Sequence, residues 1–403
     1  MLSDDAIEKL MQPIIERQEA LSRYVVELIA KRVKEIGEVS PSDVHRLERL
    51  LIMGGDAVKI NSEISRITGL NVLAIKKLIK EVAAGAYVDS KPFYDYRHKS
   101  YIPFEKNQQL QNVVKAVQKQ TLGTYKNLSN STAFMIRDLK NPSVLKPTTL
   151  SKTYQSIIDE AVQATQSGTI DYNTAMRRTM KQLNDSGIRY VTYNPESGRV
   201  FSQRLDTAVR RNILDGVRQI NQGVQDEVGK QFGADGKEIS VHAFSAPDHE
   251  PIQGHQFTNE EYDKLQNAKD FTDYKGNRFN AIKRHIGFWN CRHFTFSILL
   301  GVTKPNYTDE QLEKFKENNE KGVTLPNKKH LTMYEVTQKM RELETAIRRC
   351  KDGVMMAKES GDKELEMSYK QKMKRYQADY KYLAKLSGLK ERADKMRVSG
   401  YHG

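Results

Sequence analysis

Residues 336–357, VTQKMRELETAIRRCKDGVMMA, contain the clearest structural pattern in the chain. Apolar residues recur there at alternating spacings of four and three, which is typical of a helix that packs lengthwise against another helix. After the break at Ser360-Gly361-Asp362, a similar series follows at 365–383. The two series predict an antiparallel helical hairpin. Their apolar positions are Val336, Met340, Leu343, Ile347, Cys350, Val354 and Ala357, then Leu365, Tyr369, Met373, Tyr376, Tyr380 and Leu383.

Helical periodicity also extends through much of the chain upstream of this hairpin. Apolar residues at spacings of three and four predict one long helix over 203–230. Glycines that interrupt the pattern, including Gly54-Gly55, are the expected helix ends. The other predicted helices cover about 3–37, 43–53, 60–82, 107–117, 148–168, 171–186 and 309–315.

Two segments change from helical to alternating periodicity. Residues 188–193 and 239–244 alternate in the manner of half-buried strands, and residues 245–305 are rich in loops. We therefore expect a mainly α fold with a small α+β domain. The expected regions are an N-terminal helical region (1–94), a central helical region (95–230), a loop-rich α+β domain with Cys and His (231–305), and a C-terminal helical hairpin with a basic tail (306–403).

The composition excludes several classes of protein. Two cysteines among 403 residues are too few for a disulfide-built secreted module. No apolar run approaches the roughly 18 residues of a membrane-spanning helix, and the acidic start Met1-Leu2-Ser3-Asp4-Asp5 is unlike a signal peptide, so we expect synthesis and folding in the cytoplasm. The net charge of +14 and the pI of about 9.4 indicate a polyanionic neighbour such as nucleic acid.

The positive charge is concentrated toward the C-terminus. Residues 304–403 hold 23 Lys and Arg against 16 Asp and Glu, a net +7. We expect the terminal segment 391–403 to be mobile. The basic residues predicted to contact nucleic acid or a protein partner are Arg204, Arg210, Arg211 and Arg218 on the long helix, and Lys372, Lys374 and Arg375 on the hairpin.

The segment 242–293 concentrates the residues best suited to chemistry. It contains five of the nine histidines together with Cys291, whereas a Walker-type glycine-rich loop, Gly-x-Ser-x-Gly and His-Glu-x-x-His are absent from the sequence. Imidazole and thiolate are ligands that suit Zn²⁺. One interpretation is therefore a zinc site, whose candidate ligands are His249, Cys291 and His293, with His255 and then Asp248 behind them.

Two other interpretations of these residues stay open at this point. In the first, Cys291 is a small buried side chain and His293 a hydrogen-bonded structural residue. In the second, a neighbouring imidazole activates Cys291 as a nucleophile. The sequence names no third group or oxyanion donor for that chemistry.

A further pattern lies at 60–84. Two short helices joined by Thr68-Gly69-Leu70 would place Lys76, Lys77 and Lys80 on the second helix, in the order of a DNA-binding helix-turn-helix. The alternative is a plain helical hairpin with solvated lysines.

Two paired motifs resemble those of a known family. The string Pro247-x-His249-x-x-x-Gln253-Gly254 is followed about 35 residues later by Asn290-Cys291-Arg292-His293. These strings are similar to the signature of the phage minor capsid protein 2 family, which is related to the phage Mu-type head morphogenesis proteins. Weaker similarity on both sides extends the resemblance over about 95–315.

The resemblance implies a structural component of the virion and no enzymatic activity. Such proteins are present in few copies at the inner portal vertex of the phage head, and they assist head assembly and DNA packaging or ejection. The implied partners are the portal protein, other capsid or scaffold proteins, and packaged DNA without sequence preference. Two alternatives stay open: a metal-dependent enzyme or toxin-like transferase built on the Cys/His cluster and carried in the head, and a DNA-binding protein using 60–84.

Overall fold

The computed structural model describes most of the chain, and its described part is mainly helical with several small antiparallel sheets, as predicted. The predicted helices over 148–168 and 171–186 lie largely outside the described residues. The described residues are 4–37, 43–130, 132–137, 145–148, 189–193, 200–267, 269–282, 284–287, 291 and 293–403, with 174, 177, 178, 181, 184 and 185.

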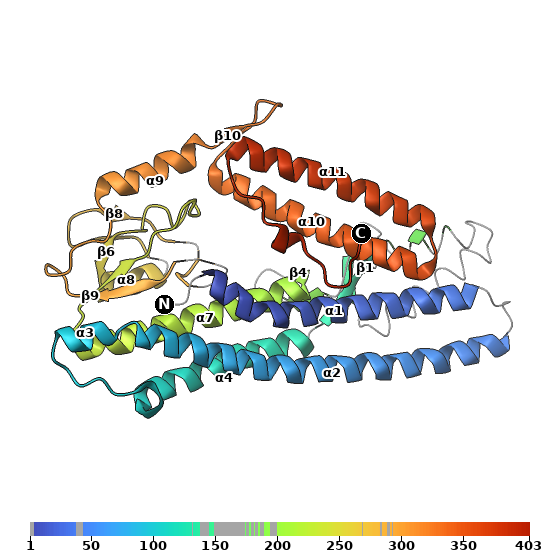
Figure 1. Cartoon of the computed structure of the whole chain (residues 1–403), viewed down its shortest axis with the longest axis horizontal. Helices are drawn as coiled ribbons and strands as arrows, with labels where there is room; N and C mark the ends of the chain where they lie inside the picture. The colour runs from blue at the N-terminus through green and yellow to red at the C-terminus, as the bar shows by residue number, and fades with distance from the viewer. Residues whose placement is uncertain are drawn as a thin grey trace.

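Four long helices form the body of the molecule. They are α1 (Asp4–Gly37), α2 (Asp43–Val88), α4 (Gln108–Asn130) and α7 (Leu205–Phe232). α1 and α2 run antiparallel, and α4 and α7 pack against α2 (Figure 1). The faces that meet are apolar, and burial of apolar surface contributes roughly 25 cal/mol per Å². The side chains fully buried between these helices include Met11, Ile14, Val25, Ile75, Ile79, Val209, Ile213, Ile220 and Val224.

The predicted break at Gly54-Gly55 and the predicted turn at Thr68-Gly69-Leu70 are both wrong, because α2 is one continuous helix. A helical glycine costs about 1 kcal/mol relative to alanine. Burial of Ile67 and Ile75 on either side of Gly69 outweighs that cost. A continuous helix excludes both the helix-turn-helix at 60–84 and its helical-hairpin alternative.

An aromatic segment fixes the end of α2 to the end of α7. The chain turns there through α3 (Lys91–Tyr96) and a short 3-10 helix, η1 (Phe104–Lys106). Tyr87 stacks on Tyr101 with ring centroids 4.8 Å apart, and Tyr94 meets Phe232 of α7 edge-on at 5.0 Å.

The predicted antiparallel hairpin is present as α10 (Met333–Ser360) and α11 (Lys363–Ser387). All of its apolar heptad positions are buried except Tyr376, which is half-buried. Gly361 ends α10 at φ +74°, a left-handed conformation that favours glycine. A Cβ on Gly353 would lie 2.7 Å from the Tyr369 ring, so glycine permits this close helix approach.

The hairpin packs against the body, and the two share one apolar core that extends from Ile7 in α1 to Ala384 in α11 (Figure 1). α10 lies along α1. Arg348 of α10 reaches Glu19 at 2.8 Å and Asp206 of α7 at 3.6 Å. From here on, the helical body means these four long helices together with the hairpin, because one apolar core joins them.

The C-terminal segment folds back onto the hairpin, contrary to the predicted mobile tail. Arg392 donates to the buried carboxylate of Glu344 at 2.7 Å, and Val398 is buried. Lys351 donates to the carbonyl of Met396, which ends the short 3-10 helix η2 (Ala393–Met396).

A small α+β region sits at one end of α7 (Figure 1). Its sheet has the antiparallel order β6-β5-β9, formed by β5 (Gly236–Ile239), β6 (Gln256–Thr258) and β9 (Thr295–Ile298). Helix α8 (Asn259–Gln266) and the pair β7 (Phe271–Thr272) and β8 (Arg278–Phe279) complete it around a separate apolar core. The strand predicted over 239–244 is displaced, since β5 ends at Ile239.

The remaining described elements connect these parts. Four strands form a sheet; they are β1 (Thr132–Arg137), β2 (Leu145–Thr148), β3 (Arg189–Tyr193) and β4 (Val200–Arg204). The order in this sheet is β2-β1-β3-β4, and β3 is the strand predicted at 188–193. Helix α9 (Asp309–Lys321), followed by β10 (Val323–Thr324) and β11 (His330–Leu331), leads into α10. None of the helices in the described ranges has the length and apolar character needed to cross a membrane.

Candidate functional site

The ends of β5 and β9 bring the histidine-rich loops together. These strands are antiparallel, with Ile239 opposite Thr295, so residues that follow β5 lie beside residues that precede β9. The rings of His242 and His293 are consequently 4.2 Å apart between centroids. The loop after His242 then turns back, and the His249 amide donates to the carbonyl of Ala246 at 2.9 Å.

Three side chains converge at this edge of the sheet, and all three are almost fully buried. The Sγ atom of Cys291 lies 3.3 Å from Nδ1 of His249 and 3.4 Å from Nδ1 of His293. The two Nδ1 atoms are 3.4 Å apart. Soft and borderline donors thus form a nearly equilateral triangle, which we call the Cys/His triad.

The outer nitrogens of both triad imidazoles are held by hydrogen bonds. Nε2 of His249 donates to the carbonyl of Arg284 at 2.8 Å. Nε2 of His293 lies 3.3 Å from Oε1 of Gln253 and 3.4 Å from the hydroxyl of Ser245. The Gln253 oxygen also accepts the backbone amide of His242, which fixes the orientation of the side-chain amide. Both histidines therefore turn Nδ1 toward Cys291.

Asp248 and Gly254 of the first motif support this arrangement from outside the triad. Asp248 binds the guanidinium of Arg284 at 2.6 Å, which positions the carbonyl that accepts from His249. Gly254 adopts φ +76°, and a Cβ there would overlap Leu312 of α9. The motif thus supplies one triad member, the amide that holds another, and the glycine at which the loop returns to the sheet.

Burial and the neighbouring charges act differently on the three members of the triad. They favour the charged forms of Cys291 and His249 and the neutral form of His293. Burial raises the pKa of the Cys291 thiol, but hydrogen bonding and attraction to His249 outweigh burial and leave that pKa below its ordinary value. Burial lowers the pKa of His249, but Cys291 and the Arg284 carbonyl raise it overall. Burial, with His242 and His249 nearby, lowers the pKa of His293 far below its ordinary value.

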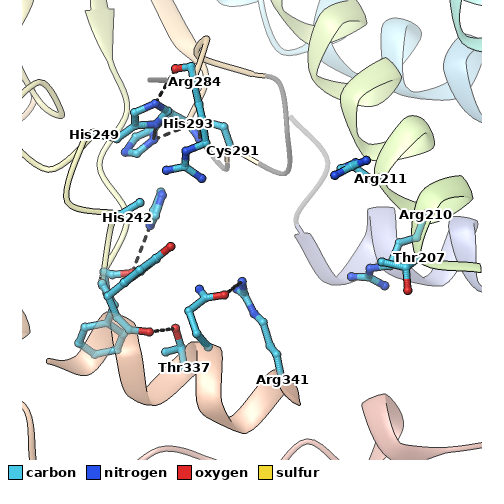
Figure 2. Close-up of a pocket in the computed structure, with 15 residues that line it drawn as sticks. Thr207, Arg210, Arg211, His242, His249, Arg284, Cys291, His293, Thr337 and Arg341 are labelled. Atoms are coloured by element: carbon cyan, nitrogen blue, oxygen red, sulfur yellow. Dashed lines mark hydrogen bonds between the residues drawn. The ribbon is translucent and has the colours of Figure 1, made fainter. Parts of the chain in front are cut away.

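The triad opens onto a cavity of about 390 Å³ between the α+β region, α7 and α10. Figure 2 shows the triad and Arg284 on one side, Arg210 and Arg211 of α7 on the other, and Arg341 of α10 below. Among the described residues, four arginines and no carboxylate line this space. We call it the arginine cavity; its charge favours an anionic occupant.

The sequence as a whole matches one family. A family model described as phage minor capsid protein 2 matches residues 2–385. The chain belongs to the phage minor capsid protein 2 family. No curated protein and no solved structure matches it. The match is wider than the resemblance over 95–315, since it also covers α1, α2 and the hairpin.

Membership gives a structural role in the phage capsid, and it places the protein in the virion among other capsid proteins. The site described above lies inside the matched range. Its three triad members and Gln253 and Gly254 all belong to the two motifs that carry the resemblance.

The structure brings together three of the four predicted zinc ligands. His249, Cys291 and His293 meet, whereas His255 lies apart from them, against Phe279 at 5.5 Å between ring centroids. His255 lines a different cavity on the side of α9. Asp248 serves the site through Arg284 rather than by joining the triad.

The basic residues predicted to contact nucleic acid or a protein partner lie in three kinds of environment: ion pairs, cavity walls and the surface of α11. Arg204 is 14% exposed and pairs with Asp206 and Asp352, and Arg210 pairs with Glu8 of α1. Arg211 lines the arginine cavity, and Arg218 lines a neighbouring cavity beside α8. On α11, Lys374 and Arg375 are exposed, while Lys372 is half-buried with its ammonium 5.8 Å from the centre of the Tyr369 ring.

Three residues of the site were not predicted from the sequence: Arg284, Arg341 and Gln253. Gln253 stands in a quoted motif, so its place there was a usable signal. Arg284 and Arg341 belong to no motif, and Arg341 enters the site only because the hairpin packs against the body.

Proposed function

We propose that this minor capsid protein acts at the portal vertex of the phage head as a structural component that assists head assembly and DNA packaging or ejection. The match to the capsid family over 2–385 carries the proposal. The resemblance to head morphogenesis proteins supports the portal vertex in particular. The protein's role is to bind and position partners, not to catalyse a reaction.

The outward face of α11 supports contact with packaged DNA. Lys374, Arg375, Lys381 and Lys385 are all exposed on this helix. Neutralising phosphates releases counterions, so such a face binds DNA of any sequence and binds it less tightly as salt increases. A head protein beside densely packed DNA needs this kind of sequence-independent contact.

Exposed apolar side chains on the same helix support a protein partner. Met367, Tyr382 and Leu386 are 60%, 47% and 39% exposed, although the opposite face of α11 is buried against α10. Tyr382 and Leu386 lie one helical turn apart near the C-terminal end of α11, and Met367 lies near its other end. Neighbouring exposed apolar side chains are typical of interaction sites. We assign the portal protein as this partner.

The location is tested with purified particles of the phage that encodes the protein. A phage deleted for the gene is complemented with a tagged copy, and gradient-purified, nuclease-treated virions are examined by quantitative immunoblotting and by immunogold labelling. We expect few copies per particle, at one vertex, and defective heads without complementation. Normal infectious heads without the protein, or label spread over the shell, would contradict the proposal.

The DNA contact is tested by charge reversal on α11. The double variant Lys374→Glu, Arg375→Glu is compared with Lys115→Glu, Lys119→Glu, which reverses two exposed lysines on α4. We expect weaker binding of duplex DNA by the α11 variant and a shallower salt dependence, by about two units in the log–log slope. An equal loss in the α4 variant would assign the binding to net charge and not to the α11 face.

A further inference from the structure

The donor triangle of the Cys/His triad has the dimensions of a metal coordination face. Zinc binds thiolate at about 2.3 Å and imidazole at about 2.0–2.1 Å, in tetrahedral geometry. Those bond lengths place neighbouring ligand atoms about 3.3–3.6 Å apart. The three separations in the triad are 3.3, 3.4 and 3.4 Å, so one ion can contact Cys291, His249 and His293 together.

The protons at the triad also indicate a cation. Nε2 of His249 faces a carbonyl, which only accepts, and must therefore carry the hydrogen. Nε2 of His293 likewise donates to Gln253, whose oxygen already accepts a backbone amide. The three inward-facing atoms, Sγ of Cys291 and the two Nδ1 atoms, then share a single proton, whether it stays on the thiol or moves to Nδ1 of His249. At least one Nδ1 lone pair is left without a hydrogen-bond donor. A metal ion satisfies all three donors.

The surrounding hydrogen bonds are those of a metal site. Imidazole ligands are commonly fixed by a hydrogen bond from the nitrogen that does not bind the metal, to a carbonyl or carboxylate. His249 has such a bond to Arg284, whose guanidinium is in turn held by Asp248. His293 has one to Gln253.

The three protein ligands leave the fourth coordination position to the arginine cavity. A structural zinc site is closed by four protein ligands, whereas three ligands leave room for an exchangeable one. Cys291, His249 and His293 all line the cavity, together with Arg211, Arg284 and Arg341. The described lining includes no carboxylate that could take the fourth position. A Zn²⁺ ion bound by one thiolate and two neutral imidazoles keeps one positive charge, which an oxyanion neutralises.

We propose that His249, Cys291 and His293 bind one Zn²⁺ ion, and that its fourth position takes a phosphate oxygen of a ligand held by the cavity arginines. Guanidinium groups suit phosphate because they donate two parallel hydrogen bonds to its oxygens. The phosphate belongs either to a nucleic acid strand or to a free phosphate or nucleotide. This inference does not rest on the location of the protein at the portal vertex.

The metal is tested on the full-length protein, purified without chelator, by elemental analysis. We expect about one zinc per chain, and loss of that zinc in Cys291→Ser. Cys350→Ser is the matched control, because Cys350 is the other buried cysteine and lies in the hairpin, so it must keep its zinc. His249→Gln and His293→Gln provide further variants, and circular dichroism establishes that each is folded.

Cobalt substitution tests the metal site and then, through the same bound ion, the phosphate ligand. Co²⁺ at the triad gives a thiolate-to-metal charge-transfer band that Cys291→Ser abolishes. Folded wild-type protein that binds neither zinc nor cobalt, or that keeps both in Cys291→Ser, overturns the metal site.

The fourth position is tested by adding inorganic phosphate, a mononucleotide or a short single-stranded DNA to the cobalt protein. We expect the cobalt d–d bands to change, and Arg341→Gln to weaken this response about tenfold while retaining the metal. A response only to DNA assigns the phosphate to a strand, and a response to inorganic phosphate assigns it to a free ligand. Unchanged d–d bands with all three probes overturn the phosphate ligand.

Discussion

The helical body and the small α+β region are held together in different ways. The body buries apolar side chains from α1 to α11 in one continuous core. Nine of the described residues of the α+β region form a separate apolar core, and the loops of this region depend on buried polar side chains such as Glu238, His249 and His293. The body is therefore stabilised mainly by buried area, whereas the α+β region depends on whether each buried polar group has its partner.

Glu238 shows how a buried polar group with its partners stabilises the α+β region. Its carboxylate is fully buried in β5 and accepts from the side chain of Gln256 and from the backbone and side chain of Asn306. An unpartnered buried carboxylate would be strongly unfavourable. Its three hydrogen bonds join β5, β6 and the segment that leads to α9.

Metal removal gives the largest expected difference between the two regions. If zinc occupies the triad at about 1,000 times its dissociation constant, it stabilises the loops by about 4 kcal/mol. Chelation should then accelerate hydrogen exchange about 1,000-fold at the amides of His249 and Gln253, which donate within the loop, and of Gly254, which donates to Ile239 in β5. Amides of α10 should keep their protection, because the body has its own core.

Hydrogen exchange with mass spectrometry, before and after chelation and again after zinc is restored, measures this difference. Equal acceleration in α10 would show that the two regions unfold as one unit. Unchanged exchange in both would contradict a metal contribution to the α+β region.

A core substitution in α2 should act on the body in a similarly strong way. Ile79 is fully buried between helices, so Ile79→Ala should lower the free energy of unfolding by about 2–5 kcal/mol. Leu73→Ala, on the same helix but 66% exposed, should change it by less than about 0.5 kcal/mol. Urea unfolding monitored by circular dichroism compares them, and similar losses in both variants would contradict the burial of this face.

The sequence predicts the body far better than the α+β region, and the two modes of stabilisation explain why. The heptad spacing from Val336 to Leu383 is visible because each position repeats the same requirement for burial. In α2, the glycine pattern gives a wrong prediction. Gly69 indicates a turn, but the burial of Ile67 and Ile75 keeps the helix continuous. Local preference gives way where tertiary burial is larger.

Only the candidate metal ligands of the site could be predicted from the sequence. Residue type and motif position indicate His249, Cys291 and His293, but residue type also admits His255, which the structure places apart from them. Their separation follows from the pairing of β5 with β9, which no local pattern reveals. Arg341 joins the cavity from a helix that begins about 40 residues after Cys291, so its role depends on the packing of the hairpin.

Glu19, a carboxyl group packed inside the helical body, should make the stability of the body depend on pH. Burial, with Asp206 and Asp352 nearby, raises the pKa of Glu19 to about 7 despite Arg348. The unfolded chain loses this proton near pH 4.5 and the folded chain near pH 7, so this group lowers stability as pH rises between those values. The loss amounts to about 3 kcal/mol.

Glu19→Gln keeps the size of the side chain and removes the titration. Relative to the unmodified protein, the variant should gain stability as pH is raised from about 5 to about 8, measured by urea unfolding at each pH. Glu342→Gln, on the exposed face of α10, is the matched control and should leave the profile unchanged. Parallel profiles for the Glu19 variant and the unmodified protein would contradict the raised pKa.

The smallest expected effect distinguishes a continuous α2 from a helix-turn-helix. Gly69 lies within the helix, and the space that a Cβ would occupy there has no neighbouring atom within 4 Å, so Gly69→Ala should raise the free energy of unfolding by about 0.5–1 kcal/mol. Gly233→Ala should lower it, because Gly233 ends α7 at φ +74°, where alanine is strained although space is open. The same substitution thus has opposite signs inside a helix and at its end. Destabilisation by Gly69→Ala in thermal unfolding would mean that the chain turns there, and it would restore the DNA-reading segment that a continuous helix excludes.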